Sequence, residues 1–414
     1  MKSRRKFLNN LGMLLFSGAA TRSSIGIGQE QFAFSDAGYW DLVRAQFSFE
    51  ESAVPMNAAN LCPSFRSVSN AVSSLTQDID KDCSFNNRSK FGTLLEESRD
   101  IIARQLNVDT DEIALVRNTS EANNIINNGL TLSAGDEVVL WDQNHPTNNI
   151  AWSVRAERFG FSVKRVTSPT LPKSEQELLD LFVSHFSANT KVVALTYVSN
   201  TSGVKLPIKA IASAARARGI YVHVDGAQVW GAMPLDLDEL GIDSFSASSH
   251  KWLMGPKEVG LLYINRNNID RIWPNIISAG WGNESATHLK GARKFESLGQ
   301  RNDSALAAVG TTVKQLELIG LQRIEARTVE LSQLLKEGVV EAGIELITPI
   351  DPILSHGVCI MEVPSDKRSE IVDSLYQNFG IAGAPTGGLR LCPAIYNTKE
   401  HVERAIAAVQ QLLG

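Results

Sequence analysis

Between residues 110 and 265, short apolar runs rich in β-branched residues alternate with longer amphipathic stretches. Such runs are typical of strands buried on both faces, and their alternation with helices is typical of a mainly parallel sheet covered by helices. The predicted strands span 112–117, 137–141, 162–166, 191–198, 221–225, 244–247 and 260–264. The predicted helices between them span 121–129, 147–158, 174–186 and 207–218.

The pattern changes after residue 300. One long helical stretch is predicted over 303–341, and a region follows that reads strand, helix, strand, helix. These last elements are predicted at 357–363, 367–379, 389–394 and 399–413. The prediction is therefore an α/β protein with two domains: a large one over 56–290 around a seven-stranded, mainly parallel sheet, and a smaller α+β one over 291–414. An N-terminal segment over 30–55 precedes them.

Residues 1–29 differ from the rest of the chain. A basic head containing Arg4 and Arg5 precedes an apolar stretch from Leu11 to Ala20 that ends in small residues. This order is typical of an export signal, and the paired arginines resemble the twin-arginine type; a basic tail with a short helix is the alternative. The stretch is shorter than the ~20 residues that a bilayer core requires. We expect periplasmic export without membrane insertion, or a cytoplasmic protein if the signal is not functional.

The net charge and the cysteine spacing limit which binding partners and metal sites are expected. Removing 1–29 takes away five of 40 basic side chains and leaves 35 against 45 acidic ones, a net charge of −10. An acidic body argues against nucleic acid or an anionic membrane as partner. The four cysteines lack Cys-x-x-Cys spacing, so no metal site is predicted, and Cys62 with Cys83 is the nearest pair for one disulfide in an oxidising compartment.

Polar residues follow the predicted strands at several of their ends. Because ligands of an open α/β sheet gather at the carboxyl ends of its strands, we expect these side chains to share one site. The candidates are Thr119, Ser120, His145, Asn200, Asp225, Gln228, Ser248, His250 and Lys251.

Asp225 and Lys251 form the most informative pair. Lys251 can form a Schiff base with the aldehyde of pyridoxal 5'-phosphate, and a strand-end acid such as Asp225 can keep the pyridine nitrogen protonated. A surface lysine is the alternative for Lys251, and a helix N-cap is the alternative for Asp225. The buried setting predicted for Asp225 favours a cationic partner.

Four further residues support this interpretation less directly. Thr119 and Ser120 begin a helix whose free N–H groups suit a phosphate beside Lys251; taken alone, these residues are better explained by simple capping. His145 can stack on the pyridine ring or remain a solvated loop residue. Arg390 offers a planar fork for a substrate α-carboxylate, or forms a structural salt bridge.

The chain resembles the class V aminotransferases, a family of fold-type I pyridoxal-phosphate enzymes, from about residue 50 to the C-terminus. The motifs that carry the resemblance are 118–121, 145–146, 198–203, 225–228, 248–252, and Arg390 followed by 396–398. The lysine motif with Trp252 and the strand 390–393 look most like the isopenicillin N epimerase branch.

The resemblance implies a homodimer with shared active sites and gives each candidate a role. Lys251 carries the cofactor, Asp225 faces the pyridine nitrogen and Arg390 holds the substrate carboxylate. His145 stacks on the ring. Many members have a Gly-Thr pair that contacts the neighbouring subunit's phosphate; in this chain that contact would have to be made by Gln300 or be absent. The remaining assignments give Thr119, Ser120, Ser248 and His250 to the phosphate, and Asn200 and Gln228 to the O3' side.

One departure concerns sulfur chemistry. The loop 381–388 lacks the cysteine that a desulfurase uses, and Cys392 looks like a packed core thiol. We therefore expect an enzyme that is not a cysteine desulfurase and that acts on an amino acid or related amine. An aminotransferase is the first expectation. An epimerase, a lyase and a non-catalytic binding protein of the same fold are the alternatives.

Overall fold

The computed structural model describes residues 36–277, 279, 281 and 287–413. The chain divides between residues 39 and 40 into two units, and the fold below is that of the second. The expected export signal over 1–29 lies outside the described residues and stays a prediction. The expected domain boundaries at 56, 290 and 291 also stay predictions.

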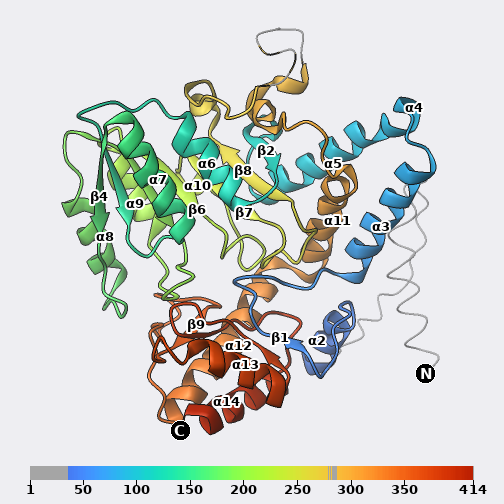
Figure 1. Cartoon of the computed structure of the whole chain (residues 1–414), viewed down its shortest axis with the longest axis vertical. Helices are drawn as coiled ribbons and strands as arrows, with labels where there is room; N and C mark the ends of the chain where they lie inside the picture. The colour runs from blue at the N-terminus through green and yellow to red at the C-terminus, as the bar shows by residue number, and fades with distance from the viewer. Residues whose placement is uncertain (1–35, 278, 280, 282–286, 414) are drawn as a thin grey trace, which may run out of the picture. The chain divides into compact units, whose positions relative to one another are not determined.

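The large sheet has seven strands in the order β2-β8-β7-β6-β5-β3-β4 (Figure 1). Strand β8 runs antiparallel to both of its neighbours, and the other adjacent pairs are parallel. All seven predicted strands, and with them the predicted fold class, are confirmed. Their bounds are β2 Ile113–Val116, β3 Glu137–Trp141, β4 Ser162–Val166, β5 Thr190–Thr196, β6 Tyr221–Asp225, β7 Ser244–Ser248 and β8 Gly260–Ile264.

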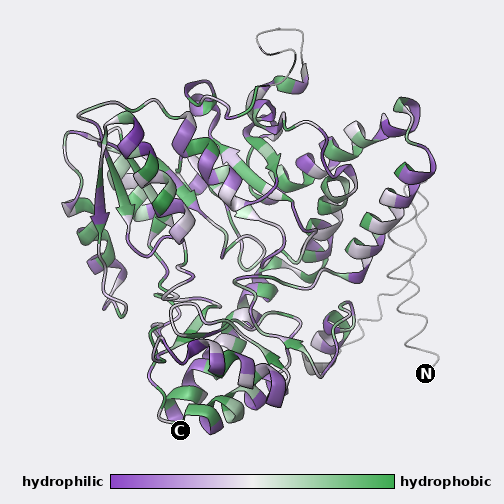
Figure 2. Ribbon diagram, viewed as in Figure 1, coloured by the Kyte–Doolittle hydropathy of each residue, from purple (hydrophilic) through white to green (hydrophobic). Residues whose placement is uncertain are grey.

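Burial explains why these runs form strands. Every residue of β6 is buried, whereas β4, at the edge of the sheet, is only partly buried and appears mostly purple in Figure 2. Successive side chains of a strand point to opposite faces, so Tyr221, His223 and Asp225 share one face of β6. Tyr221 belongs to the core cluster that includes residues of helices α6 and α7, and this face of the sheet is therefore the one that α6 and α7 cover.

The helices between the strands begin and end where local chemistry favours it. The Asn118 side chain accepts a hydrogen bond from the Glu121 amide and caps α6. His145 caps α7, whose first residue is Pro146, and Gly160 ends it in the left-handed conformation. The bounds are α6 Thr119–Gly129, α7 Pro146–Phe159, α8 Glu175–Ser184, α9 Ile208–Arg216 and α10 Leu237–Leu240.

The single helix predicted over 303–341 is wrong in one respect. Gly320, with φ +91° and ψ 120°, separates α11 (Asp303–Ile319) from α12 (Leu321–Glu341). The remaining predicted elements of this region are present, and their strands are shorter than expected. Their bounds are β9 Cys359–Met361, α13 Arg368–Phe379, β11 Leu389–Leu391 and α14 Lys399–Leu413. Strand β10, Ile381–Ala382, was not predicted.

The N-terminal part of the second unit packs against two other parts of the fold. Val54 and Met56 join the hydrophobic core that α12, α13 and α14 build around β9 and β11, and β1 pairs with β10. Helices α3 and α5 pack against α11. These N-terminal elements were not predicted from the sequence, and they are α2 Asp36–Arg44, β1 Val54–Pro55, α3 Arg66–Lys81, α4 Phe85–Arg88 and α5 Lys90–Gln105. The 3₁₀ helices are η1 Thr110–Glu112, η2 Arg266–Arg271, η3 Thr287–Leu289 and η4 Gly291–Glu296.

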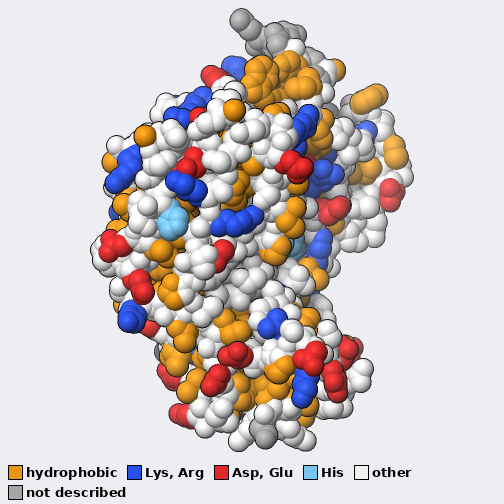
Figure 3. Space-filling view, turned by 60° about the vertical axis from the view of Figure 1, so that its left-hand side comes forward, with side chains coloured by type: hydrophobic (Ala, Val, Ile, Leu, Met, Phe, Trp, Pro, Cys, Tyr) orange, Lys and Arg blue, Asp and Glu red, His pale blue; other side chains and the backbone are white. Residues whose placement is uncertain are grey.

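Acidic and basic side chains are interspersed over the face shown in Figure 3. No helix within the described part of the chain combines the length and the apolar character needed to cross a bilayer. Cys62 is buried, Cys83 is exposed and both are free thiols, so the suggested disulfide between them is not formed.

Candidate functional site

A pocket of about 240 Å³ opens at the carboxyl ends of β2, β3, β5, β6 and β7. Sequence elements more than 100 residues apart converge on it, as expected for an open α/β sheet. Nine of the predicted site residues line it, together with residues that were not predicted. The lining residues are Asn60, Asn118, Thr119, Ser120, Asn123, His145, Thr147, Thr196, Asn200, Asp225, Ala227, Gln228, Ser248, His250 and Lys251.

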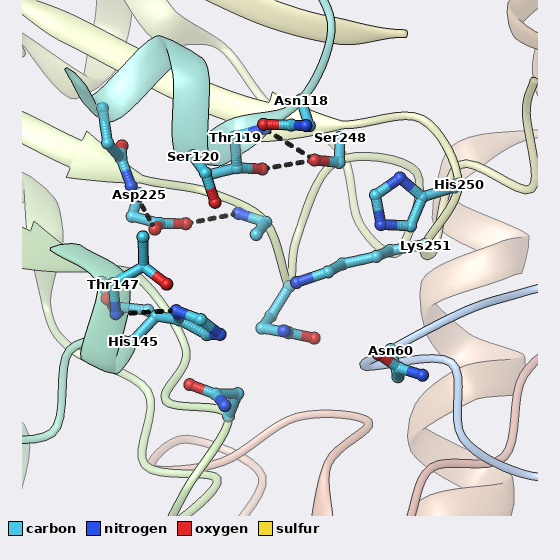
Figure 4. A pocket seen from close by; sticks show the side chains of 15 residues that line it. Asn60, Asn118, Thr119, Ser120, His145, Thr147, Asp225, Ser248, His250 and Lys251 are labelled. Carbon is cyan, nitrogen blue, oxygen red and sulfur yellow. Dashed lines mark hydrogen bonds between the residues drawn. The ribbon is translucent and has the colours of Figure 1, made fainter. Parts of the chain in front are cut away.

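Lys251 extends into the pocket from the side opposite Asp225 (Figure 4). Burial lowers the pKa of the Lys251 amine; nearby Asp225 opposes this shift and Arg390 adds to it. A lysine with a lowered pKa spends more time as the neutral amine, which is the nucleophilic and proton-accepting form. The pocket therefore holds an activated amine facing a carboxylate.

Asp225 ends β6 as a buried carboxylate that accepts two hydrogen bonds. One comes from the Ala227 amide at 3.0 Å and the other from the Asn123 side chain at 2.9 Å. No lysine or arginine forms an ion pair with it among the described residues. Gly226 is required at the next position, because a Cβ there would lie 1.8 Å from the Phe245 ring.

The N-terminus of α6 faces the top of the pocket in Figure 4, beside Ser248 and His250. The Ser248 hydroxyl lies 2.6 Å from the Thr119 hydroxyl and accepts the Thr119 amide at 2.8 Å. Burial, followed by the nearby Lys251 and Lys257, lowers the pKa of His250 to about 4. Ser120 adds another hydroxyl to this end of the pocket. Free N–H groups and hydroxyls at a helix N-terminus suit a phosphate.

His145 lies on the same side of the pocket as Asp225, with Thr147 between them in Figure 4. Its Nδ1 accepts the Thr147 amide at 3.3 Å, which orients the ring at the start of α7. Burial lowers the pKa of His145, and the nearby Lys251 lowers it further. A neutral, oriented imidazole at this position is suited to stacking on a flat ring.

Two pocket atoms are left unsatisfied by the described residues. Asn200 Oδ1 and Thr196 Oγ1 are buried without a hydrogen-bond partner, although buried polar groups normally have one. Gln228, in contrast, uses its amide on the protein, donating to the Ala59 carbonyl at 3.1 Å and accepting from the Trp252 indole at 2.8 Å. Asn200 and Thr196 thus offer free polar atoms to a bound group.

Arg390, on β11, is buried with only 4% of its surface exposed. Its guanidinium donates to the Asn200 carbonyl and to the Asn57 side chain, both at 3.0 Å. No carboxylate forms an ion pair with it among the described residues, and its Nε has no partner there. The structural salt bridge considered for Arg390 is therefore absent from the described part of the chain, and burial lowers the pKa of this arginine.

Gln300 is exposed and lies outside the pocket. Its side chain accepts from Arg88 at 3.0 Å and donates to the Arg301 carbonyl. Its expected contact with a neighbouring subunit stays a prediction.

Sequence reasoning missed Asn60, Asn123 and Thr147, which line the pocket, and Asn57, which holds Arg390. Asn123 lies four residues after Thr119 on α6, and this helical spacing places both on one face. That signal was available in the sequence. No local signal marks Asn57 or Asn60.

Comparison with known proteins shows the family to which the chain belongs. The family model for class V aminotransferases matches residues 83–404. Isopenicillin N epimerase of Streptomyces clavuligerus is 27% identical over 392 residues, covering 91% of this chain and 98% of that protein. Cysteine desulfurase of Pectobacterium atrosepticum is 27% identical over 344 residues, covering 77% of this chain and 82% of that protein.

Solved structures show the same fold. The cysteine desulfurase CsdA of Escherichia coli, with an S-sulfonic acid, has a TM-score of 0.79 at 22% identity and covers 90% of this chain and 98% of that one. A C-DES mutant with glycine covalently linked to its PLP cofactor has a TM-score of 0.80 at 22% identity and covers 89% and 98%.

These findings correct one expectation. The exclusion of cysteine desulfurases is wrong, because cysteine desulfurases are among both the sequence relatives and the structural neighbours. One cysteine missing from loop 381–388 does not exclude this group of enzymes. Cys392 is indeed buried in the core, but that observation does not separate this chain from those relatives.

Proposed function

The chain belongs to the class V aminotransferase family and uses pyridoxal 5'-phosphate, and we propose that it acts on the α-carbon of an amino acid with Lys251 as the base. One observation carries the proposal. Lys251 lines the same pocket as the buried carboxylate of Asp225, and the buried guanidinium of Arg390, close enough to lower the pKa of Lys251, has no carboxylate partner among the described residues.

The residues around the pocket fit the cofactor. When bound, pyridoxal phosphate supplies an aldehyde for a lysine and a protonated ring that withdraws electrons. The start of α6, with Thr119, Ser120 and Ser248, would hold the phosphate. Asp225 would face the ring nitrogen, and His145 would stack on the ring. Asn200 Oδ1, which has no partner among the described residues, is available to a polar group on the O3' side.

Lys251 serves first as an attachment point and then as a base. Its burial favours the neutral amine, which can accept a proton from the substrate α-carbon and return it. The same amine is the only lysine that lines the described pocket. Proton removal from the α-carbon therefore falls to this side chain.

Arg390 would bind the substrate carboxylate. Two of its N–H groups are used by Asn200 and Asn57, which fixes the plane of the fork. Its unpaired Nε and the remaining N–H groups suit a bidentate contact with a carboxylate. A bound amino acid would thus be held by Arg390 with its α-carbon near Lys251.

Aminotransfer is the first reaction proposed, because it follows from proton removal at the α-carbon and return to the cofactor. Epimerisation is the second candidate. It is supported by the match to isopenicillin N epimerase, which extends over 98% of that protein.

A substrate panel tests the proposal. Holoenzyme is incubated with L- and D-amino acids, with and without a keto-acid acceptor, and keto acid, ammonia, sulfide and optical rotation are followed. Keto acid that depends on the acceptor supports aminotransfer, and loss of rotation alone supports epimerisation. Lys251→Ala should abolish turnover, whereas Lys257→Ala, six residues away, should not. A fully loaded enzyme that changes no amino acid in the panel overturns the proposal, and sulfide release from cysteine as the main reaction overturns both named reactions.

A further inference from the structure

A chain of buried hydrogen bonds leads away from Asp225 into the space between the sheet and α6. Asn123 Oδ1 lies 2.8 Å from His223 Nε2, and His223 Nδ1 lies 2.8 Å from the Ser244 hydroxyl. The Ser246 hydroxyl also donates to Asn123 Oδ1, at 2.5 Å. Every member is buried, with at most 3% of its surface exposed. His223 shares a strand face with Asp225, and that alternation places its ring beside α6.

The donor and acceptor in each hydrogen bond of this buried network follow from the charge of Asp225. An ionised carboxylate only accepts, so Asn123 turns its amide nitrogen toward Asp225 and its oxygen toward His223. His223 must then donate through Nε2. Burial lowers the pKa of His223 to about 3, so the ring is neutral and its Nδ1 accepts from Ser244. Asn123 and Ala227 each donate to one oxygen of Asp225.

We propose that His223, acting through Asn123, is a positioning residue that holds Asp225 as a carboxylate and thereby keeps the shared proton on the cofactor's ring nitrogen. Hydrogen bonds donated to a carboxylate favour its charged form. The carboxylate then attracts the proton less strongly than the ring does, and the ring keeps its electron-withdrawing form. This inference rests on the assignment of Asp225 to the ring nitrogen under the proposed function.

The test determines whether the ring nitrogen of the cofactor carries the proton. Holoenzyme is reconstituted with pyridoxal phosphate labelled with ¹⁵N in the ring, and its ¹⁵N chemical shift is compared with those of free pyridinium and neutral pyridine. His223→Leu removes one of the two donors to Asn123 Oδ1 and leaves Ser246, and His223→Gln offers an amide N–H near the position of Nε2. Val224→Ala, buried on the opposite face of the same strand, controls for general loss of packing.

We expect a pyridinium shift in the wild type, in His223→Gln and in Val224→Ala. In His223→Leu the proton partition should move toward Asp225 by up to about tenfold, the effect of one buried hydrogen bond between neutral groups. If His223→Leu does not fold, Ser244→Ala should give a smaller shift in the same direction. A neutral ring in the wild type contradicts the assignment of Asp225, whereas a protonated wild type with an unchanged shift in the folded variants overturns the role of His223.

Discussion

Replacing Arg390 with lysine should separate binding of the substrate carboxylate from the rest of the chemistry. Two of the five N–H groups of Arg390 are used by Asn200 and Asn57, and Nε is unpaired among the described residues. A bidentate contact with a carboxylate therefore remains available, and a lysine ammonium cannot reproduce it. The lost hydrogen bond and geometry amount to about 2 to 3 kcal/mol, or roughly 30-fold to 150-fold in kcat/KM.

The assay compares an amino acid substrate with the corresponding amine that lacks the carboxylate, by the absorbance change when each is mixed with holoenzyme. Arg390→Lys should slow the amino acid by this factor and leave the amine nearly unchanged. Arg327→Lys is a matched control, because Arg327 is also buried but pairs with Glu330. Equal losses for the amino acid and the amine would refute the assignment of Arg390 to the carboxylate.

Two further predictions concern stability. Burial lowers the pKa of His356 to about 3, against about 6.5 in the unfolded chain, so the unfolded state binds the proton first as the pH falls and the folded state is destabilised between these values. As the pH falls from 6 to 4, the free energy of unfolding should decrease less steeply in His356→Phe than in the wild type, by about 1.4 kcal/mol per pH unit. Urea denaturation at several pH values measures this dependence. The same pH dependence in both proteins would contradict the prediction. Gly320→Ala should destabilise the protein by about 1 to 3 kcal/mol because φ is +91°, whereas Gly92→Ala, within helix α5 and with open space around it, should stabilise it by about 0.5 to 1 kcal/mol. Equal effects at the two glycines would contradict the explanation from φ.

The large sheet could be predicted because its signal is local. Runs such as Tyr221–Asp225 are buried along their whole length and are bounded by turns, so composition alone marks them. The break between α11 and α12 was missed because Gly320 lies in an otherwise helical pattern, and a glycine there is compatible with a continuous helix. Strand β1 was missed because it is two residues long and pairs with β10 more than 300 residues later.

The residues of the candidate site also differ in whether a local sequence signal identifies them. Lys251 and Asp225 follow strands, and the topology brings strand ends together. Asn57 reaches Arg390 across 333 residues, and nothing in its own neighbourhood indicates that contact. The hydrogen bonds of Gln228 to Ala59 and Trp252 are equally non-local, so its expected place at the cofactor could not be weighed against a role in packing.

The central claim is that Lys251 carries the cofactor, and chemical mapping tests it most directly. Holoenzyme is reduced with borohydride, digested and examined by mass spectrometry for a lysine that bears the reduced pyridoxyl group. The account predicts one label, on Lys251, and its loss in Lys251→Ala but not in Lys257→Ala. A label on Lys257 or another lysine, or no label in a protein fully loaded with pyridoxal phosphate, would contradict it.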